Sequence, residues 1–226
     1  MGKTTTRETV DQRKARGGKI LRVLKRLYPQ ADCALRHKSV LELMVSTVLS
    51  AQSTDEIVNK VTPALFRRYR TAADFAAADR AELEEIIHAT GFFRQKAKNI
   101  QRACIILVER HGGQVPGTLE ELVQLPGVAR KTANVILGSW FKKNAGVVVD
   151  THVGRLSERM GLTWRGRNSK DAVKIERDLM EIVPRRSWTY FGHAMIRHGR
   201  GVCTARKPAC DRCKIANYCP SAGRFE

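Results

Sequence analysis

Apolar residues recur at helical spacing along almost the whole chain, and this pattern restricts the fold more than any other feature. Ile20, Leu24 and Leu27 share one face of a short helix. The segment 40–49 is apolar nearly all round, which is typical of a helix in the middle of a domain. Further amphipathic segments follow over residues 83–87, 97–107, 172–182 and 188–195. Because only the valine run 147–149 hints at a strand, the sequence predicts an all-α protein.

Residues that cap helices indicate where several of these segments begin. A side-chain oxygen followed three residues later by a glutamate has the spacing of a capping box. This spacing occurs at Ser53 with Glu56, Asp79 with Glu82, and Thr118 with Glu121. Asp150 precedes THVGRL and is expected to be the N-cap of another helix.

The chain is strongly basic, with 41 Lys and Arg against 22 Asp and Glu and a net charge of +19. A polyanion is the expected partner, and nucleic acid is the commonest one. The alternative is that the excess of basic residues only keeps the protein soluble. No membrane partner is expected, because the sequence contains no run of about 18 apolar residues. No apolar stretch follows the basic N-terminus, so no export signal is expected and the predicted location is cytoplasmic, at the bacterial nucleoid. Residues 1–19 are expected to form a flexible basic arm, at most an auxiliary DNA contact.

The segment Leu125–Ala133, LPGVARKTA, has the pattern of a helix-hairpin-helix element. A short helix stops at Pro126-Gly127, and a second helix is expected to begin at about Arg130. Glycine permits the tight turn, while backbone N–H groups and the helix N-terminus can hold a phosphate oxygen. Such contacts position DNA without specifying its sequence. An ordinary corner between two helices is the alternative.

Four of the six cysteines lie within the last 24 residues of the chain. They have the spacing C-x6-C-x2-C-x5-C, formed by Cys203, Cys210, Cys213 and Cys219. Thiols packed this closely in a reducing compartment suggest a metal centre. Tetrahedral zinc usually takes two C-x2-C pairs far apart, whereas this chain has one, so zinc and a cubane iron–sulfur cluster are equally favoured by the spacing.

Taken together in this order, LPGVARKTANVIL, VVVDTHVGR and the cysteine pattern resemble the endonuclease III family of helix-hairpin-helix base-excision glycosylases. LSAQSTDEIVNKVTPALF and TGFFRQKAKNI match the family as well, so the resemblance extends from about Leu21 to Cys219. One departure is Ala129, which stands where the family usually has the second glycine of the hairpin. If that position needs a positive φ, alanine there would be strained.

The resemblance implies a six-helix barrel domain over residues 33–144, with the hairpin at about 118–140. It also implies a second helical domain made of 20–32 with 145–226, in which the loop 203–219 binds a [4Fe–4S] cluster. The DNA cleft is expected between the two domains. The cluster ligands would be Cys203, Cys210, Cys213 and Cys219, and the cluster role would be structural.

The same resemblance assigns roles to individual residues. Lys131 matches the family's lysine nucleophile and Asp150 its essential aspartate. The lysine has to lose its proton to be nucleophilic, and a nearby carboxylate can accept that proton. Without the resemblance, Lys131 would be interpreted as a phosphate-binding cation. Expected DNA contacts are Gln52, Phe92, Gly127, Ala129, Arg130, Thr132, His152, Arg206 and Lys207.

The implied activity is that of a bifunctional DNA glycosylase and abasic-site lyase that acts, as a monomer, on oxidised pyrimidines in duplex DNA. Gln52 would fill the hole left by the flipped base and Phe92 would wedge the opposite strand; solvent-facing and core positions are their alternatives. An adenine-mismatch glycosylase is the nearest rival, but it carries a glutamate where this chain has Thr47. A non-catalytic DNA-binding module is the alternative from another class.

Overall fold

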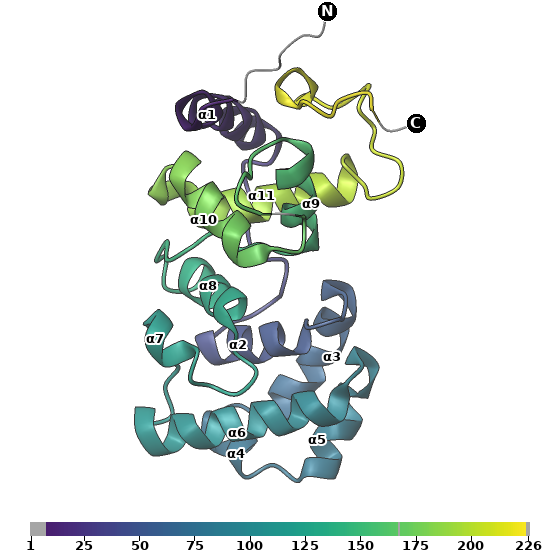
Figure 1. The fold of residues 1–226 in the computed structure, drawn as a ribbon. Helices are drawn as coiled ribbons and strands as arrows, with labels where there is room; N and C mark the ends of the chain where they lie inside the picture. Colours follow the sequence, from purple (N-terminus) through teal and green to yellow (C-terminus); the bar gives the residue numbers. More distant parts are fainter. Residues whose placement is uncertain (1–7, 167, 225–226) are drawn as a thin grey trace, which may run out of the picture. The chain divides into compact units, whose positions relative to one another are not determined.

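The computed structural model describes residues 8–166 and 168–224, and in this part of the chain every regular element is a helix (Figure 1). The all-α prediction is therefore confirmed for the described residues. No helix among them is long and apolar enough to cross a membrane. The chain divides into two compact units. Residues 33–145 form the hairpin unit, and the described residues up to 32 together with those from 146 onward form the cluster unit.

The hairpin unit is built around a buried central helix, α2 (Val40–Leu49). Every residue from Leu43 to Leu49 is buried, which agrees with a sequence that is apolar on all sides. Helix α2 packs against helices from several parts of the unit. The others are α3 (Asp55–Arg68), α4 (Ala72–Ala76), α5 (Arg80–Ile87), η1 (His88–Thr90), α6 (Phe93–His111), α7 (Leu119–Leu122) and α8 (Arg130–Ser139).

Short polar side chains fix where these helices begin. Asp79 accepts a hydrogen bond from the N–H of Glu82 at 2.9 Å, and Thr118 caps α7, so both predicted caps are confirmed. The predicted cap at Ser53 is wrong by one residue, because Thr54 accepts from the N–H of Ile57 and α3 begins at Asp55. Two adjacent hydroxyl residues made this boundary ambiguous in the sequence.

The cluster unit has its own apolar core, in which α1 packs on α10 and α11 while α9 packs on α11. Its elements are α1 (Val10–Leu27), α9 (Thr151–Arg159), α10 (Ala172–Ile182), η2 (Arg185–Ser187), α11 (Trp188–Gly201) and η3 (Ala216–Tyr218). The strand suggested by residues 147–149 is wrong: these valines are buried, but no described segment pairs with them as a strand. Their burial, rather than a sheet, accounts for their apolar character.

The basic N-terminal segment differs from the flexible arm expected over residues 1–19. Residues 1–7 lie outside the described part, but α1 begins at Val10 behind a capping box formed by Thr9 and Gln12. Arg13 donates to the carbonyls of Gly161 and Thr163 at 2.8 and 3.2 Å, and Arg16 donates to other carbonyls of the same unit. In the sequence these arginines are simply positive charges, whereas in the structure their hydrogen bonds hold α1 against the rest of the cluster unit.

Candidate nucleic-acid interface and metal centre

The predicted hairpin is present as α7, a turn and α8. Gly127 lies in the turn with φ +82°, a conformation that side chains with a Cβ rarely adopt. A Cβ at this position would also come within 3.1 Å of Asn99 Cβ and 3.3 Å of Val48 Cγ1. The turn is closed by the Val128 N–H, which donates to the Leu125 carbonyl at 3.0 Å. Glycine is therefore required here both by the backbone and by the space available.

Ala129, the departure from the family pattern, causes no backbone strain. Its φ is −78° and its ψ is 169°, an extended conformation that is ordinary for alanine. Ala129 is the N-cap of α8 and provides no side-chain hydrogen bond to the first turn. The N–H groups at the start of α8 are thus not covered by a capping side chain, which suits a helix end that holds an anion.

Lys131 is the second residue of α8, and its side chain is exposed. Every residue from Ala133 to Ser139, in the part of the helix that follows, is buried, which holds the helix in place. Arg130 is exposed as well, and Thr132 is half-buried. The segment 127–132 therefore presents glycine, backbone N–H groups and two cations within one turn of chain.

Asp150 is the N-cap of α9, as the sequence predicts. Its Oδ1 accepts a hydrogen bond from the N–H of Val153 at 2.8 Å, and the residue is half-buried. Two residues on, His152 is held near Arg155, whose Nη2 lies 3.2 Å from His152 Nδ1. Burial lowers the pKa of His152, so its neutral form is favoured despite the carboxylate nearby. Lys131 belongs to the hairpin unit and Asp150 to the cluster unit.

Gln52 and Phe92 lie in two short turns of the hairpin unit, and both side chains are exposed. Both residues have positive φ, +54° for Gln52 and +48° for Phe92. Phe92 is 65% exposed, so the core position considered as its alternative is excluded. The Phe92 ring is thus exposed on a left-handed backbone, a conformation uncommon outside glycine.

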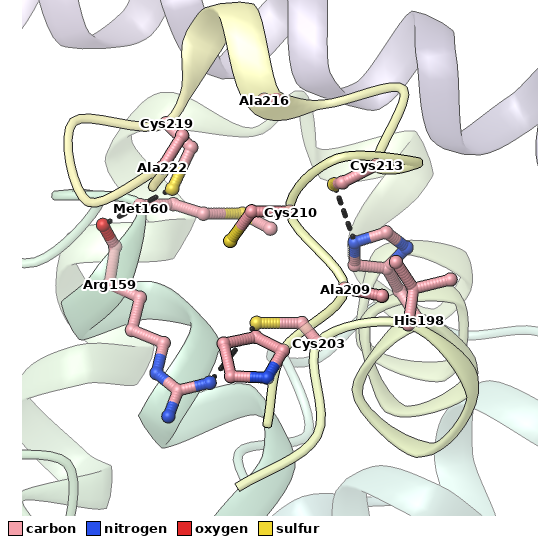
Figure 2. Close-up of a pocket in the computed structure, with 12 residues that line it drawn as sticks. Arg159, Met160, His198, Cys203, Ala209, Cys210, Cys213, Ala216, Cys219 and Ala222 are labelled. Carbon is pink, nitrogen blue, oxygen red and sulfur yellow. Dashed lines mark hydrogen bonds between the residues drawn. The ribbon is translucent and has the colours of Figure 1, made fainter. Parts of the chain in front are cut away.

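The four C-terminal cysteines line one pocket of the cluster unit (Figure 2). The rest of the lining is largely apolar, including Met160, Val202, Ala209 and Ala222. Burial raises the pKa of the Cys213 and Cys219 thiols, and the neighbouring thiols raise it further. Among the described residues no three potential ligands lie close enough to hold a single metal ion. Four sulfurs around one largely apolar space are a donor set that fits an iron–sulfur cluster.

Two basic side chains contact these sulfurs directly. Arg159 Nη1 lies 3.4 Å from Cys203 Sγ and donates to the Thr204 carbonyl at 2.7 Å. His198 Nε2 lies 3.5 Å from Cys213 Sγ, while its Nδ1 is 3.0 Å from the Tyr28 hydroxyl. Burial lowers the pKa of His198 to about 4, so the imidazole is neutral at pH 7. Figure 2 shows both side chains at the edge of the pocket.

The sequence pattern did not predict these supporting residues. Arg155 Nη2 donates to the carbonyls of Gly199 and Cys203 at 3.0 and 2.9 Å, so α9 holds the cluster loop through two arginines spaced four residues apart. That spacing is visible in the sequence and places both side chains on one helix face. Their partners are backbone carbonyls, however, which occur at every residue and therefore cannot be identified from a sequence pattern.

Arg206 and Lys207 occupy the loop between the first two cysteines, and both are exposed. The Thr204 hydroxyl donates to the Lys207 carbonyl at 2.6 Å, and the Ala209 N–H donates to the Val202 carbonyl at 3.0 Å. These bonds fix the loop backbone from which the two cations project.

Comparisons with known proteins identify the family. Residues 45–185 match the HhH-GPD superfamily of base excision DNA repair proteins, and residues 203–219 match the iron-sulfur binding domain of endonuclease III. An endonuclease III from Synechocystis sp. is 56% identical over 210 residues, which cover 93% of this chain and 94% of the relative. The chain belongs to the endonuclease III family.

Solved structures of endonuclease III agree with this assignment. A non-covalent endonuclease III–DNA complex has a TM-score of 0.87 and 40% identity, covering 93% of this chain and 97% of the other. A trapped endonuclease III–DNA covalent intermediate has a TM-score of 0.86 and 38% identity, covering 96% and 99%. The fold is thus that of the helix-hairpin-helix glycosylases, as predicted. The protein is a DNA glycosylase and abasic-site lyase of base excision repair, it binds DNA, and its cofactor is a [4Fe–4S] cluster.

Proposed function

We propose that the protein excises oxidised pyrimidines from duplex DNA and then cuts the strand on the 3′ side of the abasic site by β-elimination. The observation that carries the proposal is the position of Lys131, an exposed amine in the first turn of a helix that no side chain caps. Groups that can hold a phosphate therefore lie beside a group that can act as a nucleophile. The covalent DNA intermediate trapped with a relative supports a covalent step.

The proposed chemistry assigns one role to each reactive side chain. The damaged base is flipped out of the stack, because its glycosidic bond cannot be reached inside the duplex. The base leaves with the electrons of that bond, and the Asp150 carboxylate stabilises the positive charge that develops at C1′. The Lys131 amine, whose proton passes through water to the departed base, forms a bond to C1′, and cleavage of the C1′–O4′ bond opens the sugar ring and gives a Schiff base. Loss of a C2′ proton expels the 3′ phosphate, and water then releases Lys131.

The two turns of the hairpin unit supply the groups proposed to occupy the DNA after flipping. Gln52 fills the space of the flipped nucleotide, and Phe92 enters the opposite strand. Their exposure and their left-handed backbone support these roles. Phosphates are held by the start of α8 and by Arg206 and Lys207 in the loop of the cluster unit.

The cluster, when bound, supplies a structural cross-link within the C-terminal loop, held by Cys203, Cys210, Cys213 and Cys219. The loop backbone is also hydrogen-bonded to α9 through Arg155 and Arg159.

We propose that the protein works as a monomer.

The structure argues against the adenine-mismatch alternative at the position where that enzyme needs an acid. Thr47 lies in the buried part of α2, and its hydroxyl donates to the Leu43 carbonyl at 2.7 Å. The hydroxyl cannot protonate a leaving base as a glutamate can.

Excision assays on defined duplexes test the proposal. Duplexes that contain thymine glycol should lose the base and be cut, whereas duplexes that pair adenine with 8-oxoguanine should remain intact. Lys131→Gln should abolish cutting of both the thymine-glycol duplex and a preformed abasic duplex. Excision of adenine, or binding to every duplex without any base release, would refute the proposal.

A further inference from the structure

Lys96 is a buried cation that the proposed chemistry does not use. It lies on α6, is 4% exposed, and donates from Nζ to two backbone carbonyls, those of Leu49 and Thr90, each at 2.7 Å. Burial lowers the pKa of Lys96 because it penalises the charged form. A buried ammonium group is retained only where its hydrogen bonds are worth the desolvation.

Both carbonyls end a helical segment. Leu49 is the last residue of α2 and Thr90 is the last residue of η1. Carbonyls at a helix C-terminus lack the hydrogen bonds that continue along the helix, and they carry partial negative charge. A cation between the two ends satisfies both and joins segments that lie 47 and 6 residues from Lys96 in the chain.

Each of these helix ends leads directly into a turn with a left-handed residue. Gln52, with φ +54°, follows the end of α2, and Phe92, with φ +48°, follows the end of η1. Among the described residues only one other residue besides glycine, Lys142, has positive φ. Such a backbone is strained and persists where the surroundings hold it.

We propose that Lys96 is a positioning residue that locks the Gln52 turn and the Phe92 turn together, so that both side chains enter the DNA as one rigid unit. The inference rests on the proposed roles of Gln52 and Phe92 and adds the group that aligns them. One ammonium bonded to both helix ends keeps the distance between the turns fixed, because neither turn can move without breaking a buried, charge-assisted hydrogen bond. The two turns then need no ordering when the base is flipped.

Lys96→Met tests the proposal, because methionine keeps the length and apolar stem of lysine but donates no hydrogen bond. Loss of both bonds should lower kcat/KM for thymine-glycol excision by about tenfold or more. Lys98→Met on the same helix is the matched control, because Lys98 is exposed, and it should stay within about twofold of the parent. Circular dichroism at the assay temperature should show that both variants are folded.

The decisive readout is whether Lys96 acts through the two turns. When Lys96→Met is added to a protein that already carries Gln52→Ala and Phe92→Ala, excision should fall by no more than about a further twofold, because the two side chains that Lys96 aligns are already absent. A fluorescent base opposite the lesion should report slower unstacking in Lys96→Met than in the parent. The same full loss in both backgrounds, or unchanged excision in Lys96→Met, overturns the proposal.

A second measurement covers the case in which Lys96→Met fails to fold. In the otherwise unaltered protein, Gln52→Ala and Phe92→Ala should then show coupled effects on excision, differing from independence by about threefold or more. Independent effects overturn the proposal. If the parent itself excises no oxidised pyrimidine, the proposed function fails instead, and the two failures are thereby distinguished.

Discussion

Gly127→Ala should destabilise the hairpin unit by an amount that follows from its geometry. A left-handed backbone at φ +82° costs alanine about 1–2 kcal/mol. The new Cβ would meet Asn99 Cβ at 3.1 Å and Val48 Cγ1 at 3.3 Å. Such overpacking destabilises the folded state by about 1 kcal/mol. Alanine also makes the unfolded chain less flexible than glycine does, which offsets about 0.5–1 kcal/mol of the loss. The net loss of about 2 kcal/mol should lower the Tm by about 4–8 °C.

Ala129→Gly, two residues further on, is the matched control. Its φ of −78° suits both residues, so the change relieves no strain. Glycine makes the unfolded chain more flexible, which lowers the free energy of unfolding by about 0.5–1 kcal/mol, but it is a better N-cap than alanine and restores a few tenths of a kcal/mol. The Tm should therefore fall by less than about 4 °C. Circular dichroism of the cluster-loaded protein, at one heating rate, measures both. If Gly127→Ala melts with the parent, or Ala129→Gly loses more than Gly127→Ala, the account of the turn is refuted.

Three further predictions concern the phosphate contacts, the aspartate and the cluster loop. Arg206→Ala with Lys207→Ala should flatten the log–log salt dependence of DNA binding by about one to two units, for damaged and undamaged duplexes alike; an unchanged slope would place the loop away from DNA. Asp150→Asn keeps an acceptor for the Val153 N–H and should retain the Tm, whereas Asp150→Ala should lose about 1 kcal/mol of stability. Both variants should release the damaged base more slowly by orders of magnitude. Melting curves measure the difference in stability, and excision assays measure the common loss of base release. Arg159→Met removes the donor to Cys203 Sγ and the Thr204 carbonyl, so iron should be lost to a chelator faster than from the exposed-site control Arg206→Met; equal rates of iron loss would contradict this.

Much of the fold could be predicted from the sequence, because local chemistry determines helix starts and turns. The caps at Asp79, Thr118 and Asp150 needed only a side-chain oxygen at the right spacing, and the hairpin needed only Pro-Gly between two apolar patterns. The segment 147–149 misled for a physical reason: consecutive valines indicate burial, and burial occurs in an extended segment without a sheet partner.

What the sequence could not show is how cations bond to the backbone. Arg13, Arg159 and Lys96 look like surface charges in a basic chain, yet each donates to carbonyls of distant segments. The acceptors are backbone atoms present at every position, so no residue pattern marks them. Part of the net charge of +19 therefore stabilises the fold, and we propose that exposed cations such as Arg206 and Lys207 contact DNA.

The covalent role of Lys131 is the central claim, and locating the adduct tests it most directly. Borohydride added during the reaction with a thymine-glycol or abasic duplex should reduce the Schiff base to a stable protein–DNA adduct. Mass spectrometry of the digested adduct should then place the DNA remnant on the peptide that contains Lys131, and Lys131→Gln should give no adduct while it still binds the duplex. An adduct on another amine, or full trapping of Lys131→Gln, would contradict the account.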